Sequence, residues 1–360
     1  MKKILQKWIR SVRFWLLMLV PLSGVLTLAA KNSTDFAECY YTCCYQYMAW
    51  IFHNITGLLP FSLGEILVLT VPFALAGYVI YTVTKARKTG GKTVLKAFLN
   101  LMCTASAVLF LFTANCGMNY YRRGVGEQMG IDTKPVSAEE LYQTCVYLAE
   151  KASEIREQLS EDDKGVMVLS EHTEQKAAKY VSELLGNHLS QPKSVMLSRG
   201  MSYLNITGVY FPFTFEANVN TDIPAFTIPS TMCHELAHVS GIMHEEDANF
   251  MAFLSCIESE DKEFAYSGYT MAMIYAFNAL YENDRGRYET LSGVLSDGVQ
   301  RDLSAQSAYW KEFETPVAEV AANINDSYLK SNSQEAGVKS YGKMVDLTIA
   351  FLKEKILEKS

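Results

Sequence analysis

Residues 229–249 read PSTMCHELAHVSGIMHEEDAN, and the prediction of the fold starts from this stretch. Hydroxyl residues such as Ser230 and Thr231 commonly cap the first turn of a helix, and a glycine such as Gly241 commonly follows its last turn. The letters between these positions include no glycine and no proline. The pattern therefore predicts one short helix closed by Gly241, and a second helix at about residues 245–258.

The first of these helices carries the pattern His-Glu-x-x-His. Because residues four apart on a helix share one face, His234 and His238 present two imidazoles to one point, where both can bind Zn²⁺. Glu235 lies about 100° further around the helix and can act as general base on a water at the metal. The sequence thus predicts a catalytic zinc site, with two ordinary surface histidines as the structural alternative.

A catalytic zinc usually has three protein ligands and one open position, and several residues compete to be the third ligand. His244 completes the spacing His-Glu-x-x-His-x-x-Gly-x-x-His, in which the glycine turns the chain and returns a third imidazole. Glu245 offers a carboxylate instead, with Asn249 four residues later to support the ligands from behind. Glu246 and Asp247 are further carboxylates. The spacing alone leaves the choice open.

The residue composition is different in the segment before the His-Glu-x-x-His helix. Residues 203–211 are β-branched and aromatic and predict a strand, while residues 213–220 predict a second strand or an extended loop. Glu216, Asn218 and Asn220 alternate, so they would share one face of an extended chain. We expect them either to bind substrate backbone beside the zinc or to form structural hydrogen bonds that support the helix.

The rest of the chain after residue 136 is acidic and has helical spacing of its apolar residues. Helices are predicted, besides the two above, at about 137–160, 170–187, 267–283, 303–325 and 341–357. Four tyrosines of this region could supply a hydroxyl that stabilises a developing oxyanion. They are Tyr266, Tyr269, Tyr328 and Tyr341, although most of the 21 tyrosines are expected to be core or interface residues.

Three apolar stretches occupy the N-terminal part, at about residues 14–30, 63–83 and 94–116. About 20 apolar residues suffice for a helix to span a bilayer. The first stretch begins like a signal peptide, with basic residues before it. Two further stretches follow, and the residues at its end form a poor cleavage site, so we expect the first stretch to stay as a membrane anchor. The predicted organisation is a membrane region over residues 1–120 and a second domain over residues 121–360.

The charge is divided unevenly along the chain. Residues 1–123 contain 13 Lys and Arg but 3 Asp and Glu, whereas the remainder is strongly acidic. A basic, hydrophobic N-terminus is typical of membrane topology signals, and the acidic remainder would repel nucleic acid. The basic loop at 85–96 predicts a cytoplasmic N-terminus and places residues 31–62, and everything after 117, outside the cytoplasm. The aromatic-rich 31–62 segment is expected to form an interfacial helix.

Eight cysteines are present without a Cys-x-x-Cys pair, so a structural zinc ribbon is not expected. Cys39, Cys43 and Cys44 cluster within the 31–62 segment. A disulfide among them requires an oxidising compartment, and their redox state is left open. The scattered cysteines are expected to be small buried hydrophobic residues.

One longer run resembles a known family. Residues 208–220 (GVYFPFTFEANVN), together with the HELAH motif and Glu245 to Phe250, resemble a family of bacterial membrane proteins catalogued as a domain of unknown function and related to HExxH zinc peptidases of the zincin and gluzincin type. Residues 325–330 and 340–342 and the three apolar stretches extend the resemblance over most of the chain. The resemblance implies Glu245, not His244, as the third ligand. Phe215 departs from it, because the family often has glycine there.

The prediction is a mainly α chain: three N-terminal transmembrane helices followed by a zincin-like α+β metallopeptidase domain with a small β-element. It is expected to lie in the bacterial cell membrane as a multi-pass protein, with its catalytic domain outside the cytoplasm and with peptides or proteins as substrates. Zn²⁺ is the expected cofactor. The alternatives are a non-catalytic zinc-containing sensor or peptide- or cell-wall-binding membrane protein, and a metal-free scaffold.

Overall fold

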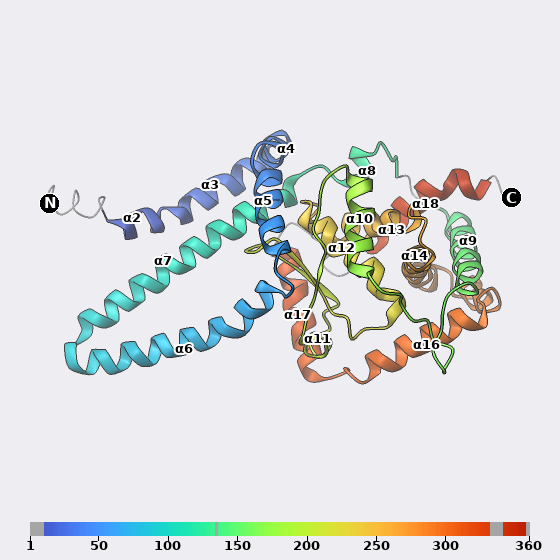
Figure 1. Cartoon of the computed structure of the whole chain (residues 1–360). Helices are drawn as coiled ribbons and strands as arrows, with labels where there is room; N and C mark the ends of the chain where they lie inside the picture. Colours follow the sequence, from blue (N-terminus) through green and yellow to red (C-terminus); the bar gives the residue numbers. More distant parts are fainter. Residues whose placement is uncertain (1–10, 134–135, 332–340, 358–360) are drawn as a thin grey trace.

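The computed structural model describes residues 11–133, 136–331 and 341–357 of the chain. Helices dominate it and the strands are few and short, so the predicted mainly α class is confirmed. Three apolar helices project from one side of a folded helical part (Figure 1).

The three apolar helices are long and apolar enough to cross a membrane. The first covers Val12–Asn32 as α2 (Val12–Leu17) and α3 (Leu19–Asn32). The others are α6 (Leu63–Thr89) and α7 (Gly91–Asn115), which confirms the three predicted stretches within a few residues. The basic residues expected to orient the first helix, Lys2, Lys3, Lys7 and Arg10, lie outside the described residues.

The segment between the first and second apolar helices is helical, as the prediction for residues 31–62 required. It consists of α4 (Thr34–Tyr40), the π-helical turn η1 (Tyr41–Tyr45) and α5 (Gln46–Gly57). Tyr45 is fully buried, and its hydroxyl lies 3.0 Å from the carbonyl oxygen of Val239 and 3.3 Å from that of His238. This contact ties the segment to the end of the histidine-bearing helix.

The remaining helices form the folded part around two buried clusters. The prediction of one helix at 303–325 is wrong, because the chain forms two helices there, α16 (Asp297–Lys311) and α17 (Pro316–Ser331). The break lies before Pro316, since a residue that precedes proline disfavours helical backbone. The helices are α8 (Val125–Gln128), α9 (Ala138–Arg156), α10 (Thr173–Leu185), α11 (Ser198–Ser202), α12 (Ile228–Val239), α13 (Glu245–Ile257), α14 (Lys262–Asn283), α15 (Arg285–Thr290), α16 (Asp297–Lys311), α17 (Pro316–Ser331) and α18 (Tyr341–Leu357), with 3₁₀ turns η2 (Gly117–Tyr121), η3 (Ala225–Thr227) and η4 (Leu291–Gly293).

The small β-element is a three-stranded sheet of β1 (Lys193–Ser194), β2 (Gly208–Phe211) and β3 (Glu216–Val219). The strand order is β1-β3-β2, with β1 parallel and β2 antiparallel to the central β3. Strand β2 begins five residues later than predicted, because α11 and a turn with Asn205 in the left-handed region (φ 56°) occupy the preceding residues.

Phe215 lies between β2 and β3 with a positive φ of 55°, a conformation that favours glycine. Its ring is buried and stacks on Phe52 of α5 at 5.7 Å between centroids. Packing of the Phe215 ring therefore stabilises a backbone conformation that glycine would adopt without strain. In the family that the chain resembles, glycine often occupies this position, which agrees with the positive φ.

Helix α12 starts earlier than predicted. Ser230 and Thr231 do not cap it, because both lie in the first turn and donate their hydroxyls to the carbonyl of Thr227. Its end is as predicted: Gly241 has a φ of 84° and its N–H donates to His238, while the N–H of Ile242 donates to Ala237. The turn at Gly241 sends the chain directly into α13.

A buried ion pair joins three helices of the folded part. Asp302 of α16 is fully buried and accepts hydrogen bonds from Arg156 of α9 (2.7 Å) and from the hydroxyl of Tyr266 of α14 (2.6 Å). We predict that Asp302→Ala lowers the free energy of unfolding by about 3–5 kcal/mol, because it removes the buried counter-charge of the Arg156 guanidinium and leaves it the more exposed Glu161, 3.3 Å away. Denaturant unfolding of the detergent-solubilised protein measures this loss.

The matched control is Glu289→Ala, which removes the exposed partner of Arg285, 3.6 Å away. Such surface pairs contribute less than about 1 kcal/mol. Equal losses for the two variants would show that the Asp302 network does not stabilise the fold as described.

Candidate metal centre

His234 and His238 of α12 and Glu245, the first residue of α13, come together at one point. One ligand atom from each of the three residues lies within 4.8 Å of the others. The Nε2 atom of His234 is 3.3 Å from one carboxylate oxygen of Glu245, and the Nε2 atom of His238 is 3.6 Å from the other. Two imidazoles and one carboxylate form a donor set that suits zinc and leaves a fourth position open.

Local structure explains this convergence. The i, i+4 spacing puts both imidazoles on one face of α12, with ring centroids 4.6 Å apart. The tight turn at Gly241 then brings the first turn of α13 over that face. A carboxylate at a helix N-terminus is also favoured by the helix dipole, so Glu245 is a stable occupant of its position.

The second ring nitrogen of His238 is fixed by the backbone. Its Nδ1 atom lies 2.7 Å from the carbonyl oxygen of Ile242, which can only accept a hydrogen bond, so Nδ1 carries the proton. The lone pair is then on Nε2, which faces Glu245. This arrangement orients an imidazole as a metal ligand in many zinc sites.

The second nitrogen of His234 is less constrained. Its Nδ1 atom is buried and has no hydrogen-bond partner among the described residues. Burial opposes a charge on His234, but Glu245, then Glu235 and then Asn249 raise its pKa. Asn249 does so from close to the ring, although it forms no hydrogen bond of normal geometry with the Nδ1 atom. The hydroxyl of Tyr275 lies 3.5 Å from the Oδ1 atom of Asn249. Asn249 therefore stands beside His234, where a supporting residue is expected.

The three side chains perturb one another strongly. Burial raises the pKa of Glu245, but the hydrogen bond from His234 and the charges of both histidines dominate and lower it to about 2. Burial also opposes a charge on His234, yet Glu245 raises its pKa to about 9. Burial and the neighbouring His234 lower the pKa of His238 to about 4. The carboxylate is therefore ionised and a cation in this pocket is stabilised, whether a proton or a metal ion.

Glu235 lies on the neighbouring face of α12, against strand β2, and is buried. Burial raises its pKa to about 8, with His234 acting in the opposite direction. Its Oε2 atom has no hydrogen-bond partner among the described residues. Room for this carboxylate depends on Gly208, since a Cβ atom there would lie 2.5 Å from its Oε1 atom. Sequence reasoning missed Gly208, whose position in the motif run was the available clue.

His244 lies outside the three-residue group. It precedes α13 in extended conformation, and its Nε2 atom is 3.0 Å from the carbonyl oxygen of Tyr120. Its ring also meets the ring of Tyr120 edge-on. Of the competing carboxylates, Glu246 pairs with Lys343 and Asp247 is buried beside Gly124. Of the third-ligand candidates, the structure brings Glu245 to the two histidines.

Glu216 and Asn218 of β3, and Asn220 just after its end, are buried. The carboxylate of Glu216 accepts hydrogen bonds from the backbone N–H groups of Leu63 and Gly64 at the start of α6. The Oδ1 atom of Asn218 meets the hydroxyl of the α6 cap Ser62 at 2.5 Å, and Asn220 donates to the Ser202 hydroxyl and the Ile206 carbonyl. These are structural hydrogen bonds, but they do not support the histidine-bearing helix, as the structural alternative expected. Those of Glu216 and Asn218 tie the start of α6 to the sheet, and those of Asn220 hold the segment before β2.

Of the four tyrosines considered for oxyanion stabilisation, Tyr328 lies near the metal centre. Its hydroxyl is 3.3 Å from that of Tyr120 and 3.9 Å from the Sγ atom of Cys116. Burial, Cys116 and then the charge of Glu245 contribute to raising the pKa of Tyr328. Tyr266 is committed to Asp302 and Tyr269 packs on Phe253, while the side chain of Tyr341 lies outside the described residues.

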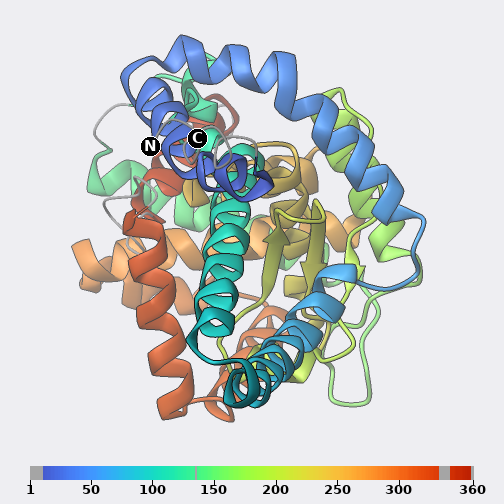
Figure 2. The same ribbon diagram turned by 90° about the vertical axis from the view of Figure 1, so that its left-hand side faces the viewer.

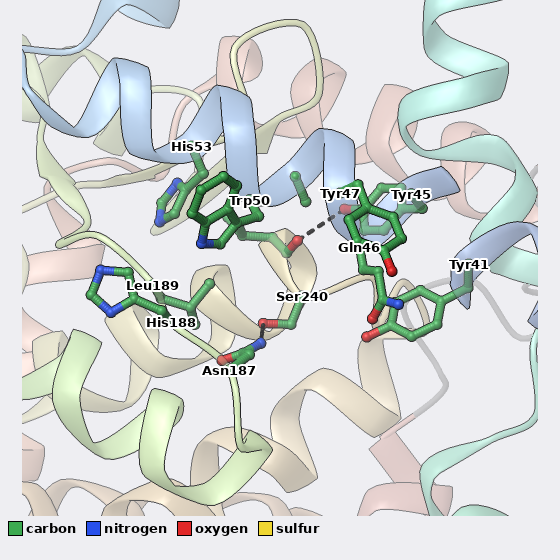
Figure 3. A pocket seen from close by; sticks show the side chains of 12 residues that line it. Tyr41, Tyr45, Gln46, Tyr47, Trp50, His53, Asn187, His188, Leu189 and Ser240 are labelled. Atoms are coloured by element: carbon green, nitrogen blue, oxygen red, sulfur yellow. Dashed lines mark hydrogen bonds between the residues drawn. The ribbon is translucent and has the colours of Figure 1, made fainter. Parts of the chain in front are cut away.

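A cavity of about 540 Å³ lies between α5 and the C-terminal end of α12 (Figure 3). Aromatic residues of the 41–50 segment form one wall, and residues 187–189 and 239–240 form the other. Tyr45 links this cavity to the metal centre, because its hydroxyl reaches the carbonyl oxygen of His238. None of the three candidate ligands lines the cavity.

Comparison with known proteins gives one match. The sequence profile of the family described as "Protein of unknown function (DUF3810)" matches residues 40–349. This range includes α6, α7, the sheet and all three candidate ligands. No curated protein and no solved structure matches the chain.

Zinc affinity distinguishes the two third-ligand hypotheses. We predict that Glu245→Gln weakens Zn²⁺ binding by more than about 100-fold, because it removes a charged ligand. Loss of a residue that only supports a ligand weakens metal binding by up to about 100-fold. His244→Ala should change the affinity little, since its imidazole faces Tyr120. Competition with a fluorescent zinc chelator gives both affinities. The reverse ranking would make His244 the third ligand.

Gly208 gives an independent test of where Glu235 lies. We predict that Gly208→Ala lowers the free energy of unfolding by about 1–3 kcal/mol through overpacking. Gly293→Ala is the control, because no atom lies within 4 Å of its Cβ position. The double variant Gly208→Ala/Glu235→Ala should recover most of the loss. Failure to recover it would mean that the carboxylate does not occupy the described position.

Proposed function

The chain belongs to the DUF3810 family of proteins of unknown function, and from its metal centre we propose that it is a membrane-anchored zinc metallopeptidase. The observation that carries this proposal is the convergence of His234, His238 and Glu245, with the buried Glu235 carboxylate on the adjacent face of the same helix. This set would supply three protein ligands to a zinc ion and a general base beside it.

A zinc ion held by the three ligands would polarise the scissile carbonyl and make water a better nucleophile. Glu235 takes the proton of the attacking water while the water oxygen forms a bond to the carbonyl carbon. The same carboxyl group then gives that proton to the leaving nitrogen as the peptide bond breaks. Its unpartnered Oε2 atom and a pKa near neutrality, about 8 before metal binds, suit both steps.

The position of strand β2 supports a peptide as the substrate. In the order β1-β3-β2, β2 is an edge strand, and its outer edge has no strand partner in the described parts of the chain. The backbone of Tyr210 on this strand lies beside Glu235, where its N–H group lowers the pKa of the carboxylate. An extended peptide that pairs with an edge strand would therefore run past the general base.

The relation to zincins and the membrane location belong to the same proposal. A His-Glu-x-x-His helix beside an edge strand, with a glutamate ligand on the next helix, is the arrangement that the gluzincin resemblance implies. The three apolar helices would supply the anchor. The predicted 85–96 loop is helical except for the turn at Gly90, but its basic residues still favour a cytoplasmic position for the turn that joins α6 to α7. The metal centre would then face peptides or proteins outside the cytoplasm, close to the bacterial membrane.

Removal of the general base is the sharpest test of catalysis. We predict that Glu235→Gln lowers the rate of peptide cleavage by about 10²- to 10⁴-fold, the usual contribution of general acid–base catalysis. Zinc content should stay at that of the wild type, because Glu235 is not a ligand. A peptide library with mass-spectrometric detection and metal analysis of both proteins give the two quantities.

Equal cleavage by wild type and Glu235→Gln would contradict the mechanism and point to a contaminating peptidase. Zinc in both proteins with cleavage in neither would favour the non-catalytic sensor or binding protein. Absence of zinc from the freshly purified and zinc-supplemented wild type would leave the metal-free scaffold as the better account.

A further inference from the structure

Helix α17 has an apolar stripe that no part of the described structure covers. Val317, Val320 and Ile324 lie on one side of the helix and are 56%, 58% and 65% exposed. Four polar residues occupy the opposite side, and Lys330 pairs there with Asp326 at 2.6 Å. They are Glu319, Asn323, Asp326 and Lys330. A helix with this division is amphipathic and needs an apolar partner for one face.

The stripe continues onto the apolar surface of α7. Tyr328 extends the stripe by one turn, and its ring lies 6.2 Å from the ring of Phe112 in the last turns of α7. Val108 and Leu111, in the same turns of α7, are also exposed apolar residues. The exposed surface of a candidate membrane span therefore runs directly into the exposed face of α17.

The position of α17 agrees with this continuity. In Figure 1, α17 and α5 both lie at the end of the folded part from which α6 and α7 project, and both run across the direction of α6. Figure 2, viewed from that end, shows them on either side of α7. Trp50 of α5 is likewise strongly exposed, as an aromatic residue at a membrane surface would be.

We propose that α17 lies on the membrane surface, with Val317, Val320 and Ile324 inserted at the boundary between lipid headgroups and acyl chains. The occupant of the stripe is lipid, because the stripe is contiguous with α7 and because the charged residues of α17, Glu319, Asp326 and Lys330, lie off it. The inference rests on the membrane location in the proposed function, but not on zinc or catalysis. It adds a non-spanning attachment to the three candidate spans and to the interfacial helix expected within residues 31–62.

This attachment has a consequence for the metal centre. Tyr328, which ends the stripe, also contacts Tyr120 and Cys116 beside Glu245. A helix seated on the membrane would thus contact Tyr120, whose carbonyl oxygen lies 3.0 Å from His244, the residue before Glu245. The proposed peptidase would then receive its substrates at the membrane surface, so its substrate class would be the membrane-proximal segments of proteins or membrane-bound peptides.

Site-specific photo-crosslinking tests the proposal. The photoreactive residue p-benzoylphenylalanine replaces Ile324 in the full chain, reconstituted in vesicles of phosphatidylethanolamine and phosphatidylglycerol. Position 322 is the matched control, because Ala322 is exposed on the opposite side of the same helix. Position 73 is the reference, because Phe73 is exposed in the middle of α6. Mass spectrometry of the intact protein after illumination measures the fraction that carries a lipid.

The expected result is a lipid adduct at position 324 in several times the yield at position 322 and comparable with the yield at position 73. A yield at 324 no higher than at 322, or crosslinks at 324 to a second copy or another protein, would overturn the proposal. No adduct at position 73 would contradict the membrane location itself. The two failures are therefore distinguishable.

Discussion

The electrostatic attraction between one carboxylate and two imidazoles is the interaction on which the candidate site depends. Glu245 is held ionised in a largely buried pocket because both histidines face it, and it keeps a positive charge on His234 in turn. Such a cluster is costly to bury unless a cation is present, and a proton shared between the residues satisfies it only partly. A divalent metal ion would satisfy all three donors and release that proton. The sharp turn at Gly241 and the backbone hydrogen bond to His238 both serve this convergence.

The apolar N-terminal part and the metal centre are built into one structure. Tyr45, in a π-helical turn between two apolar helices, reaches the carbonyl oxygens at the end of α12. The guanidinium of Arg122, just after α7, stacks on Tyr41 and donates to the carbonyl of Gly241. Glu216 on the central strand caps the start of α6. The segments that join and follow the apolar helices therefore contact the end of the ligand-bearing helix, and the start of α6 is tied to the sheet.

Much of this arrangement could be predicted from the sequence, because it depends on local rules. Length and hydropathy gave the three apolar helices, and the i, i+4 spacing placed His234 and His238 together. The sequence did not reveal the start of α12, since Thr227 begins the helix turn before the expected caps. It also missed the contact between Gly208 and Glu235 and the exposed stripe of α17, because each depends on segments brought together by the fold. Glu216, Asn218 and Asn220 could equally have been binding or structural residues until their partners were visible, at the start of α6 for the first two and at Ser202 and Ile206 for Asn220.

X-ray absorption spectroscopy at the zinc edge, on the purified full-length protein, would identify the ligands of the proposed metal centre. We expect one bound zinc with two imidazole nitrogens at about 2.0–2.1 Å and oxygen ligands at about 2.0–2.2 Å, from Glu245 and solvent. We also expect no sulfur in the first shell, although Cys233 directly precedes His234. A shell of three imidazoles would transfer the ligand role to His244. Sulfur at about 2.3 Å, or no stoichiometric zinc, would contradict the site described here.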